Sequence, residues 1–207
     1  MPTQTNVTVP RLWLASSSPR RSQLLQSLGL TFKVIVSAAE EEDFFGGSVE
    51  NTVKENARRK AHAVLSKVPA SDDIVIAADT LVAQDDQILS KPATPEEALK
   101  GLRAMSGGTH RVLTGLAIAS ASQGMRLSCT ETKVRFRKLS EEEMRAYVSS
   151  TEPYDKAGGY GIQGMACLFV DGIEGSYSNI MGLPSETLLL ELQALTHTHP
   201  LTWLAQR

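Results

Sequence analysis

Cysteine is scarce in this chain, and neither sign of charge dominates. Its 207 residues include two cysteines, Cys129 and Cys167, far apart in the sequence. Two such residues make neither a disulfide framework nor a zinc site, and their scarcity is typical of a protein from a reducing cytosol. With 21 basic and 23 acidic side chains, the formal net charge is −2. No overall basic field therefore attracts nucleic acid, and any site for an anion must be a local cluster.

Aromatic residues and long apolar runs are scarce as well. Phenylalanine, tryptophan and tyrosine make up 5% of the chain, and they form no stripe with basic residues of the kind that binds nucleic acid. No apolar run approaches the roughly 18 residues of a membrane-spanning helix. Residues 1–10 are polar and lack the apolar centre of a signal peptide, so we expect a disordered tail there. These absences predict a cytoplasmic protein with no nucleic-acid or membrane partner.

Residues 11–207 are predicted to form a single α/β domain. Hydrophobic residues make up 42% of the chain and charged residues 21%, as in soluble globular proteins. Predicted strands alternate with helices, and two antiparallel hairpins, expected at 74–89 and 110–137, favour a mixed sheet. A last hairpin is expected around 166–173. Segment 152–164 is too rich in glycine for a regular element, and is expected to be a loop that either approaches a ligand or lies on the surface.

The first predicted strand leads into an anion site built from local structure. Leu12 to Ala15 form the strand, three serines follow, and Pro19 suits the first position of a helix with Ser18 as its N-cap. Backbone N–H groups of the turn, the helix dipole, the hydroxyls and the side chains of Arg20 and Arg21 converge there. An ordinary turn with solvated arginines explains these residues equally well.

A helix predicted over 49–65 carries a lysine on its apolar side. Ser48 is a good N-cap, and at about 100° per residue Lys60 falls in the middle of the apolar stripe, with Asn56 beside it. A lysine there either extends past the core to solvent or reaches into a polar cleft. We favour the cleft, in view of the carboxylates predicted nearby. The stripe consists of Val49, Val53, Ala57, Ala61 and Val64.

Carboxylates follow two of the predicted strands. The apolar run Ile74 to Ala78 predicts a central strand buried on both faces, and it leads into Asp79 and Thr80. Proteins of the α/β class place metal ligands and catalytic acids at the carboxyl ends of such strands. The acidic run 40–43 follows a strand predicted at 31–36, and is either a solvated loop or part of the same edge.

Together, the unusual polar residues are of the types that a site for a magnesium-bound polyphosphate requires. Cations and a helix N-terminus neutralise phosphate oxygens, and carboxylates hold the metal. No serine, cysteine or histidine nucleophile with a partner base is apparent, which disfavours covalent catalysis. The residues are Ser16, Arg20, Arg21, Glu41, Lys60, Asp79 and Lys91.

Seven motifs follow one another along the chain. They are Ala15-Ser-Ser-Ser-Pro-Arg-Arg21, Ala57-Arg-Arg-Lys60-Ala, Ala78-Asp79-Thr80, Lys91-Pro92, Met105-Ser106-Gly107 with His110, Glu152-Pro-Tyr-Asp-Lys-Ala-Gly158 and Gly182-Leu-Pro184. In this order they resemble the Maf family of nucleoside triphosphate pyrophosphatases over roughly residues 11–195, and the ordered set is far more specific than any one motif. The resemblance implies a Maf/ITPase-like α/β fold, an elongated mixed β-sheet with flanking helices in two lobes around a central cleft.

The resemblance also implies an activity and a set of roles. Maf proteins hydrolyse a nucleoside triphosphate to the monophosphate and pyrophosphate with magnesium or manganese, and the family suggests a homodimer. Asp79 would be the general base or a metal-linked carboxylate. Glu41 would be the second metal ligand, with Glu40 as an open alternative because Ala39-Glu40-Glu41 replaces the common Asp-Glu pair. The residues that would bind the triphosphate are Arg20, Arg21, Lys60, Lys91 and Ser16.

Three positions agree with the family members that resemble dTTP and UTP pyrophosphatases. Those members carry Arg, Thr and Gln where this chain has Arg20, Thr80 and Gln163, whereas members acting on 7-methyl-GTP carry Trp, Gln and Glu. A glutamine amide both donates and accepts, which matches the O4 and N3–H edge of thymine or uracil. The resemblance thus implies a pyrimidine nucleoside triphosphate as substrate. The alternative is a non-enzymatic, nucleotide-sensing regulator of cell division, since the family's name comes from septum formation.

Overall fold

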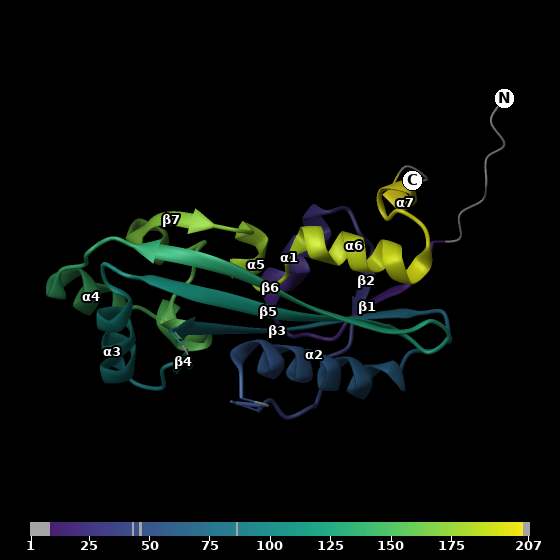
Figure 1. The fold of residues 1–207 in the computed structure, drawn as a ribbon, viewed down its shortest axis with the longest axis horizontal. Coiled ribbons are helices and arrows are strands. Elements are labelled where there is room, and N and C mark those ends of the chain that lie inside the picture. The colour runs from purple at the N-terminus through teal and green to yellow at the C-terminus, as the bar shows by residue number, and fades with distance from the viewer. Residues whose placement is uncertain (1–8, 43, 46, 86, 205–207) are drawn as a thin grey trace.

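The computed structural model describes residues 9–42, 44–45, 47–85 and 87–204. Within these ranges seven strands form one mixed sheet in the order β2-β1-β3-β5-β6-β7, with β4 also paired to β3 (Figure 1). β1 is parallel to β2 and β3, and the other pairs are antiparallel. The strands are β1 Leu12–Leu14, β2 Phe32–Val34, β3 Ile74–Gln84, β4 Gln87–Leu89, β5 Thr109–Ser120, β6 Gly124–Phe136 and β7 Val170–Glu174.

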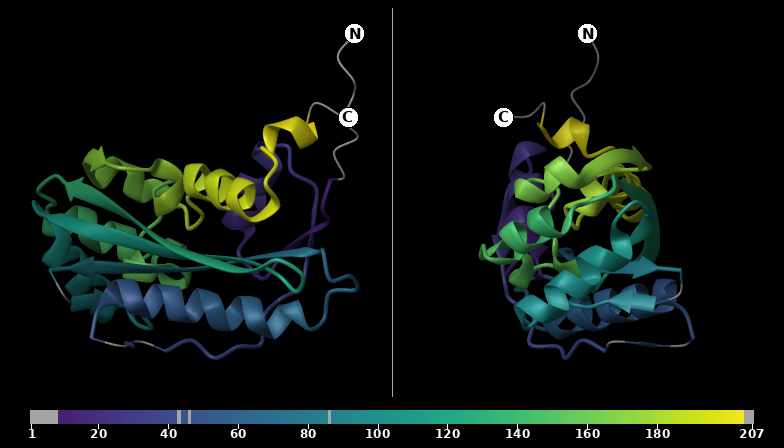
Figure 2. Two further views of the ribbon diagram at one scale, coloured as in Figure 1. Left: turned by 45° about the vertical axis from the view of Figure 1, so that its right-hand side comes forward. Right: turned by 90° about the vertical axis from the view of Figure 1, so that its left-hand side faces the viewer.

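Helices cover both faces of the sheet. α2 lies along one face, α1, α5 and α6 lie on the opposite face, and α3 and α4 pack at one end of the long strands (Figure 1 and Figure 2). None of the helices within the described ranges has both the length and the apolar character of a membrane span. The helices are α1 Pro19–Ser27, α2 Val49–Leu65, α3 Pro95–Met105, α4 Glu141–Val148, α5 Tyr177–Ile180, α6 Ser185–Thr196 and α7 Leu201–Leu204.

Side-chain alternation explains how helices pack on both faces of the central strands. Successive residues of a strand point to opposite faces. Leu14 and Ile76 therefore share a cluster with the leucines of α1 and α6, whereas Val75 and Ala77 pack with the alanines of α2. Both faces are buried, as the continuous apolar run in β3 predicts.

Most of the predicted elements are confirmed. α2 has the predicted bounds, Ser48 Oγ accepts the Asn51 N–H at 3.1 Å as its N-cap, and every residue of the predicted apolar stripe is buried. The predicted hairpins at 74–89 and 110–137 are β3–β4 and β5–β6. The mixed α/β sheet with flanking helices is therefore as expected from the sequence.

Two predictions near the C-terminal end are wrong. Residues 166–173 do not form a hairpin, because Met165–Phe169 is a short 3-10 helix and β7 pairs with β6 instead. The Glu152 carboxylate accepts the backbone N–H groups of Met165 and Ala166 at 2.8 and 3.3 Å, which stabilises the start of that helix. The glycine-rich segment is not devoid of regular structure either, since it contains the 3-10 turns Glu152–Asp155 and Ala157–Gly159.

The sheet has a gap beside the middle of β3. On one side, β5 pairs with β3 continuously from Val75 to Ala83. On the other side, β1 pairs with it at 74–76 and β4 at 82–84, and among the described residues no strand pairs with the stretch between them. Asp79 thus lies in the middle of β3 and not at its carboxyl end, the position predicted from the apolar run. It faces an opening because the neighbouring strand β1 is only three residues long.

Two large apolar clusters occupy the two ends of the long strands. One contains Leu14 and Leu25 with the inner leucines of α6. The other contains Leu102 and Phe136 with residues of α4. β3 and β5 contribute side chains to both clusters, so the same strands run through both ends of the elongated molecule (Figure 1).

Candidate active site

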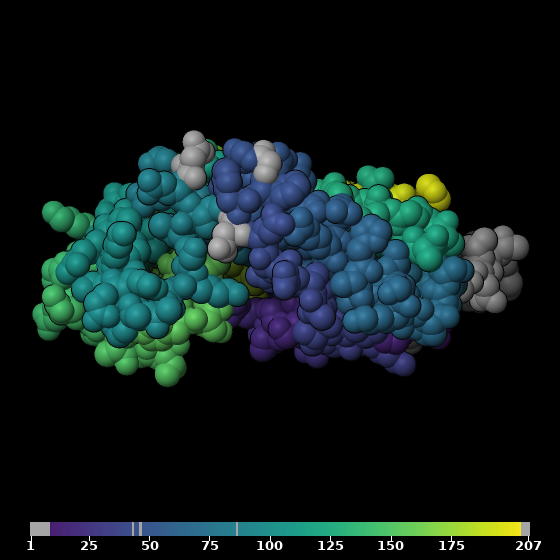
Figure 3. Space-filling view, turned by 90° about the horizontal axis from the view of Figure 1, so that it is seen from below, coloured from purple at the N-terminus to yellow at the C-terminus, as the bar shows by residue number. Residues whose placement is uncertain are grey.

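A pocket of about 570 Å³ opens beside the gap in the sheet. This volume is within the usual range of small-molecule sites. Figure 3 shows the surface hollowed between the teal segment that contains α3 and the blue and purple segments of α2 and α1. Of the nine site residues predicted from the sequence, Gln163 does not line the pocket, and the other eight do: Ser16, Arg20, Arg21, Glu41, Lys60, Asp79, Thr80 and Lys91.

Lys60, Glu41 and Asp79 meet on the α2 face of the sheet. The Lys60 Nζ atom lies 2.6 Å from Glu41 Oε1 and 2.6 Å from Asp79 Oδ1, and 3.4 Å from the Ala78 carbonyl oxygen. Lys60 and Asp79 are 8% and 5% exposed, and charges are buried to this extent only when they are paired. The lysine on the apolar stripe therefore reaches the pocket and not the solvent.

Asn56 links two segments of this group. Its Nδ2 donates to Asp79 Oδ2 at 3.0 Å and to the Glu42 carbonyl oxygen at 2.9 Å, and its Oδ1 accepts the Glu42 N–H at 3.0 Å. Sequence reasoning placed Asn56 beside Lys60 but gave it no role. The sequence did contain a sign of this role, because a buried amide one helical turn before a buried lysine must find hydrogen-bond partners of its own.

Arg21 lies on the opposite face of the sheet from Asp79. Its Nε donates to the Gly182 carbonyl oxygen at 2.7 Å, and its Nη1 and Nη2 atoms donate at 3.1 Å to Ser16 Oγ and Thr80 Oγ1. Burial lowers the pKa of the Arg21 guanidinium, and the negative charges of Asp79 and Glu41 oppose this shift. Arg21 thereby ties the β1–α1 turn to β3 and to the turn before α6.

Two more cations and a helix N-terminus border the pocket. Arg20 is about one-third exposed, and its Nη1 lies 3.6 Å from Asp155 Oδ2 across the pocket opening. Lys91 is exposed at the pocket edge. Ser18 occupies the N-cap position of α1 without a side-chain cap, while Ser16 Oγ accepts the Ser18 N–H at 3.2 Å. The first turn of α1 thus faces the pocket with N–H groups that an anion can use.

The structure places Glu40 and Glu41, the two alternatives for the second metal ligand, in different surroundings. Both are exposed, but Glu41 lines the pocket and contacts Lys60, whereas Glu40 does not line it. Gln163 is also exposed, although its neighbours Gly161 and Ile162 line the pocket. The predicted base-reading position therefore lies next to the pocket wall, and its side chain is directed elsewhere.

The donor set of the pocket fits a divalent cation. Glu41 and Asp79 each place an oxygen 2.6 Å from the same nitrogen atom, so the two carboxylates converge on one point. Magnesium binds one or two carboxylates and completes its shell with water and substrate phosphates. Within the described residues no group of three His, Cys, Asp or Glu side chains forms a closed protein cage. Two carboxylates would leave the rest of the cation's shell to water or substrate phosphates.

Tyr160 connects the pocket wall to a buried histidine. Tyr160 lines the pocket and its Oη lies 2.7 Å from His110 Nε2. His110 is 1% exposed and packs edge-on against Phe136 and Tyr160. Burial lowers the pKa of His110 from 6.5 to about 4, because the charged imidazolium would lose its hydration.

This pKa predicts a pH-dependent stability. Between pH 6.5 and about 4 the unfolded chain holds a proton on His110 that the folded chain lacks. Unfolding is therefore favoured as the pH falls through this window, by on the order of 3 kcal/mol. Urea unfolding at pH 7 and pH 4.5 should show this loss in the wild type and a smaller one in His110→Gln. Replacing the exposed His62 by Gln should leave the pH dependence unchanged, and equal pH slopes in all three proteins would contradict the assignment.

Comparison with known proteins places the chain in a family. Residues 11–195 match the Maf family, described as Maf-like protein. The chain belongs to the Maf family. The dTTP/UTP pyrophosphatase of Geobacillus sp. (strain WCH70) is 49% identical to this Maf chain over 185 residues, covering 89% of it and 98% of the relative. The dTTP/UTP pyrophosphatase of Methylobacillus flagellatus is 43% identical over 179 residues, which cover 86% of this chain and 89% of the relative.

The family match confirms the resemblance predicted from the motifs. The matched range contains all nine predicted site residues of this Maf chain, from Ser16 to Gln163, and it ends before α7. Among solved structures, the Staphylococcus aureus Ham1 protein matches with a TM-score of 0.44 and 14% identity over 61% of this chain and 71% of its own. That likeness is too weak to support a conclusion about this Maf protein.

Proposed function

We propose that this Maf protein hydrolyses dTTP and UTP, and related modified pyrimidine nucleotides, to the monophosphate and pyrophosphate with the help of Mg²⁺ or Mn²⁺. The observation that carries the proposal is the convergence of Glu41 and Asp79 on Lys60 within a pocket that two further cations border. Carboxylates, cations and helix N–H groups in one cavity are the groups that a metal-bound triphosphate requires. The names of the Geobacillus and Methylobacillus relatives support the choice of nucleotide.

The residues suggest how the hydrolysis proceeds. Glu41 and Asp79 would hold the cation, which when bound polarises phosphate oxygens as a Lewis acid. Asp79 accepts a proton from the attacking water, whose oxygen bonds to the α-phosphorus while the bond from that phosphorus to the bridging oxygen breaks. Pyrophosphate leaves with its charge neutralised by Lys60, together with Arg20 and Lys91. Ser16 and the first N–H groups of α1 orient the phosphates, and Arg21 holds that turn in place.

The specificity proposal rests on Arg20, Thr80 and Gln163. Thr80 Oγ1 is already bonded to Arg21 and lies 2.9 Å from Thr114 Oγ1, so it forms part of a fixed pocket wall. Gln163 would have to turn inward from its exposed position to read the O4 and N3–H edge of thymine or uracil. The family resemblance further supports a cytoplasmic homodimer, whose mass light scattering would measure.

A pyrophosphate-release assay tests the proposed function. We expect dTTP and UTP to yield monophosphate and pyrophosphate with Mg²⁺ or Mn²⁺, faster than CTP, GTP or 7-methyl-GTP, because Arg20, Thr80 and Gln163 match the residues of the pyrimidine-specific members. EDTA should abolish the release. Chromatography identifies the nucleotide product and thereby separates this reaction from removal of a single phosphate. Activity on 7-methyl-GTP alone would contradict the specificity, and tight binding without turnover would favour a nucleotide-sensing regulator.

A further inference from the structure

One buried amide joins the two segments that supply the carboxylates of the pocket. Asp79 belongs to β3, whereas Glu41 belongs to the loop between β2 and α2. Asn56 of α2 is 2% exposed and contacts both segments, through Asp79 Oδ2 and through the backbone of Glu42. A substitution of Asn56 is therefore expected to affect the positions of both carboxylates, Glu41 and Asp79.

The hydrogen bonds of Asn56 fix its orientation. Both N–H bonds of Nδ2 have an acceptor, the Asp79 carboxylate and the Glu42 carbonyl group, and Oδ1 accepts the Glu42 N–H. Turning the amide over would place its N–H bonds against the Glu42 N–H and its oxygen against a carboxylate oxygen. A buried polar group with all of its partners in place holds its neighbours in one geometry.

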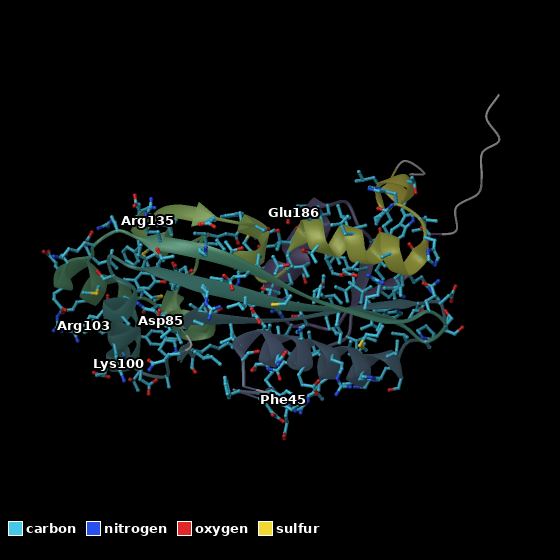
Figure 4. All side chains as sticks on the ribbon, viewed as in Figure 1. Phe45, Asp85, Lys100, Arg103, Arg135 and Glu186 are labelled. Carbon is cyan, nitrogen blue, oxygen red and sulfur yellow. The ribbon has the colours of Figure 1, made fainter. Side chains whose placement is uncertain are left out.

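Two other contacts anchor the loop that carries Glu41, and neither involves Asp79. The Glu41 side chain is 51% exposed, so holding it at Lys60 costs rotamer entropy, and a backbone that is not fixed would add its own ordering cost. Glu42 Oε1 pairs with Arg59 Nη1 at 2.6 Å, but surface ion pairs contribute little. Thr52 Oγ1 accepts the Phe45 N–H at 2.8 Å, and Figure 4 shows Phe45 below α2, on the side away from the sheet.

We propose that Asn56 is a positioning residue that sets the distance between the Glu41 and Asp79 carboxylates and thereby the affinity of the pocket for a divalent cation. The inference rests on the proposed function. Without the amide, Asp79 Oδ2 and the Glu42 backbone lose their shared partner, and only the contacts with Lys60 Nζ still hold the two carboxylates together. Removing a residue that orients metal ligands typically costs about 10- to 100-fold in metal affinity or activity.

The test compares Asn56→Ala and Asn56→Ser with Thr52→Val in the full chain. Thr52 is a matched control, because it is buried on the same helix and anchors the same loop, yet it has no bond to Asp79. Mn²⁺ alone is titrated into each protein and free Mn²⁺ is followed by electron paramagnetic resonance. Melting temperatures show how much stability each variant loses, and kcat and KM for dTTP are measured at several Mn²⁺ concentrations.

We expect the Asn56 variants to bind Mn²⁺ about 10- to 100-fold more weakly and to lose kcat, with little change in KM for dTTP at saturating metal. Thr52→Val should lose a few degrees of melting temperature and keep its Mn²⁺ affinity within about twofold. If Asn56→Ala fails to fold, Asn56→Ser is judged by the same criterion. Mn²⁺ affinities in the Asn56 variants equal to that of Thr52→Val would overturn the inference. A wild type that binds Mn²⁺ but releases no pyrophosphate would contradict the proposed function instead, since the binding comparison needs no turnover.

Discussion

Replacing Asp79 by asparagine is expected to lower the rate of pyrophosphate release from dTTP by about 100- to 10,000-fold, the usual contribution of a general base. Asparagine has nearly the same shape but cannot accept the proton of the attacking water. Its amide would also place N–H bonds against either Lys60 Nζ or Asn56 Nδ2, both of which donate to Asp79. Initial rates at saturating Mg²⁺ and circular dichroism would measure the loss and show that the variant is folded.

Asp73→Asn is the matched control for this prediction. Asp73 is 1% exposed and accepts bonds from Arg11 Nε at 2.8 Å and Trp13 Nε1 at 3.0 Å, but it does not line the pocket. Its replacement should destabilise the fold, because the buried Asp73 side chain loses the charge that both donors bond to, and leave turnover within about twofold. An Asp79→Asn protein that is folded and keeps a rate within tenfold of the wild type would rule Asp79 out as the base.

The second large effect, a loss of both stability and turnover, is expected from Gly115→Ala. Gly115 is the register partner of Asp79 on β5, and a Cβ atom there would lie 2.1 Å from the Val53 carbonyl oxygen in α2. Because that contact is with backbone, the helix must move away from the sheet, which costs about 1–3 kcal/mol or more. The movement also withdraws Lys60 and Asn56 from Asp79, and a displacement of about 1 Å can cost 100-fold in rate.

Denaturant unfolding and dTTP turnover would both measure this effect. Gly101→Ala is a suitable control, because Gly101 lies inside α3 and a Cβ atom there meets nothing within 4 Å. Alanine at that position should raise stability by about 0.5–1 kcal/mol and leave the rate unchanged. Wild-type stability and rate in Gly115→Ala would mean that α2 is not held at the distance the structure shows.

The helical part of the site is predictable from the sequence, because the spacing of residues along a helix is fixed. The apolar stripe of α2 places Lys60 and Asn56 on the buried side before any tertiary contact is known. The same rule predicts that Arg20 and Arg21 contact different parts of the site, since neighbours on a helix point in directions about 100° apart. Their side chains reach Asp155 and Gly182, respectively, but which of the two turns inward depends on how α1 packs.

Contacts between distant segments are not predictable from local patterns. The gap beside Asp79 exists because β1 and β4 pair with different parts of β3, and strand pairing is not encoded in the periodicity of any one strand. The exposed position of Gln163 follows from the local turns of residues 157–169, where Glu152 accepts the N–H groups of Met165 and Ala166 from 13 and 14 residues along the chain. The alternation of β5 gives no sign that Gly115 lies under a helix.

The continuity of β3 and β5 through both apolar clusters limits how the pocket opens. Two lobes joined by a flexible linker can swing apart, but here such a motion would have to bend paired strands that belong to both ends at once. We therefore expect a triphosphate to enter through side-chain movements, such as separation of Arg20 from Asp155. The phosphate-binding part of such a pocket would be preorganised, and little of the ligand's affinity would be lost to domain closure.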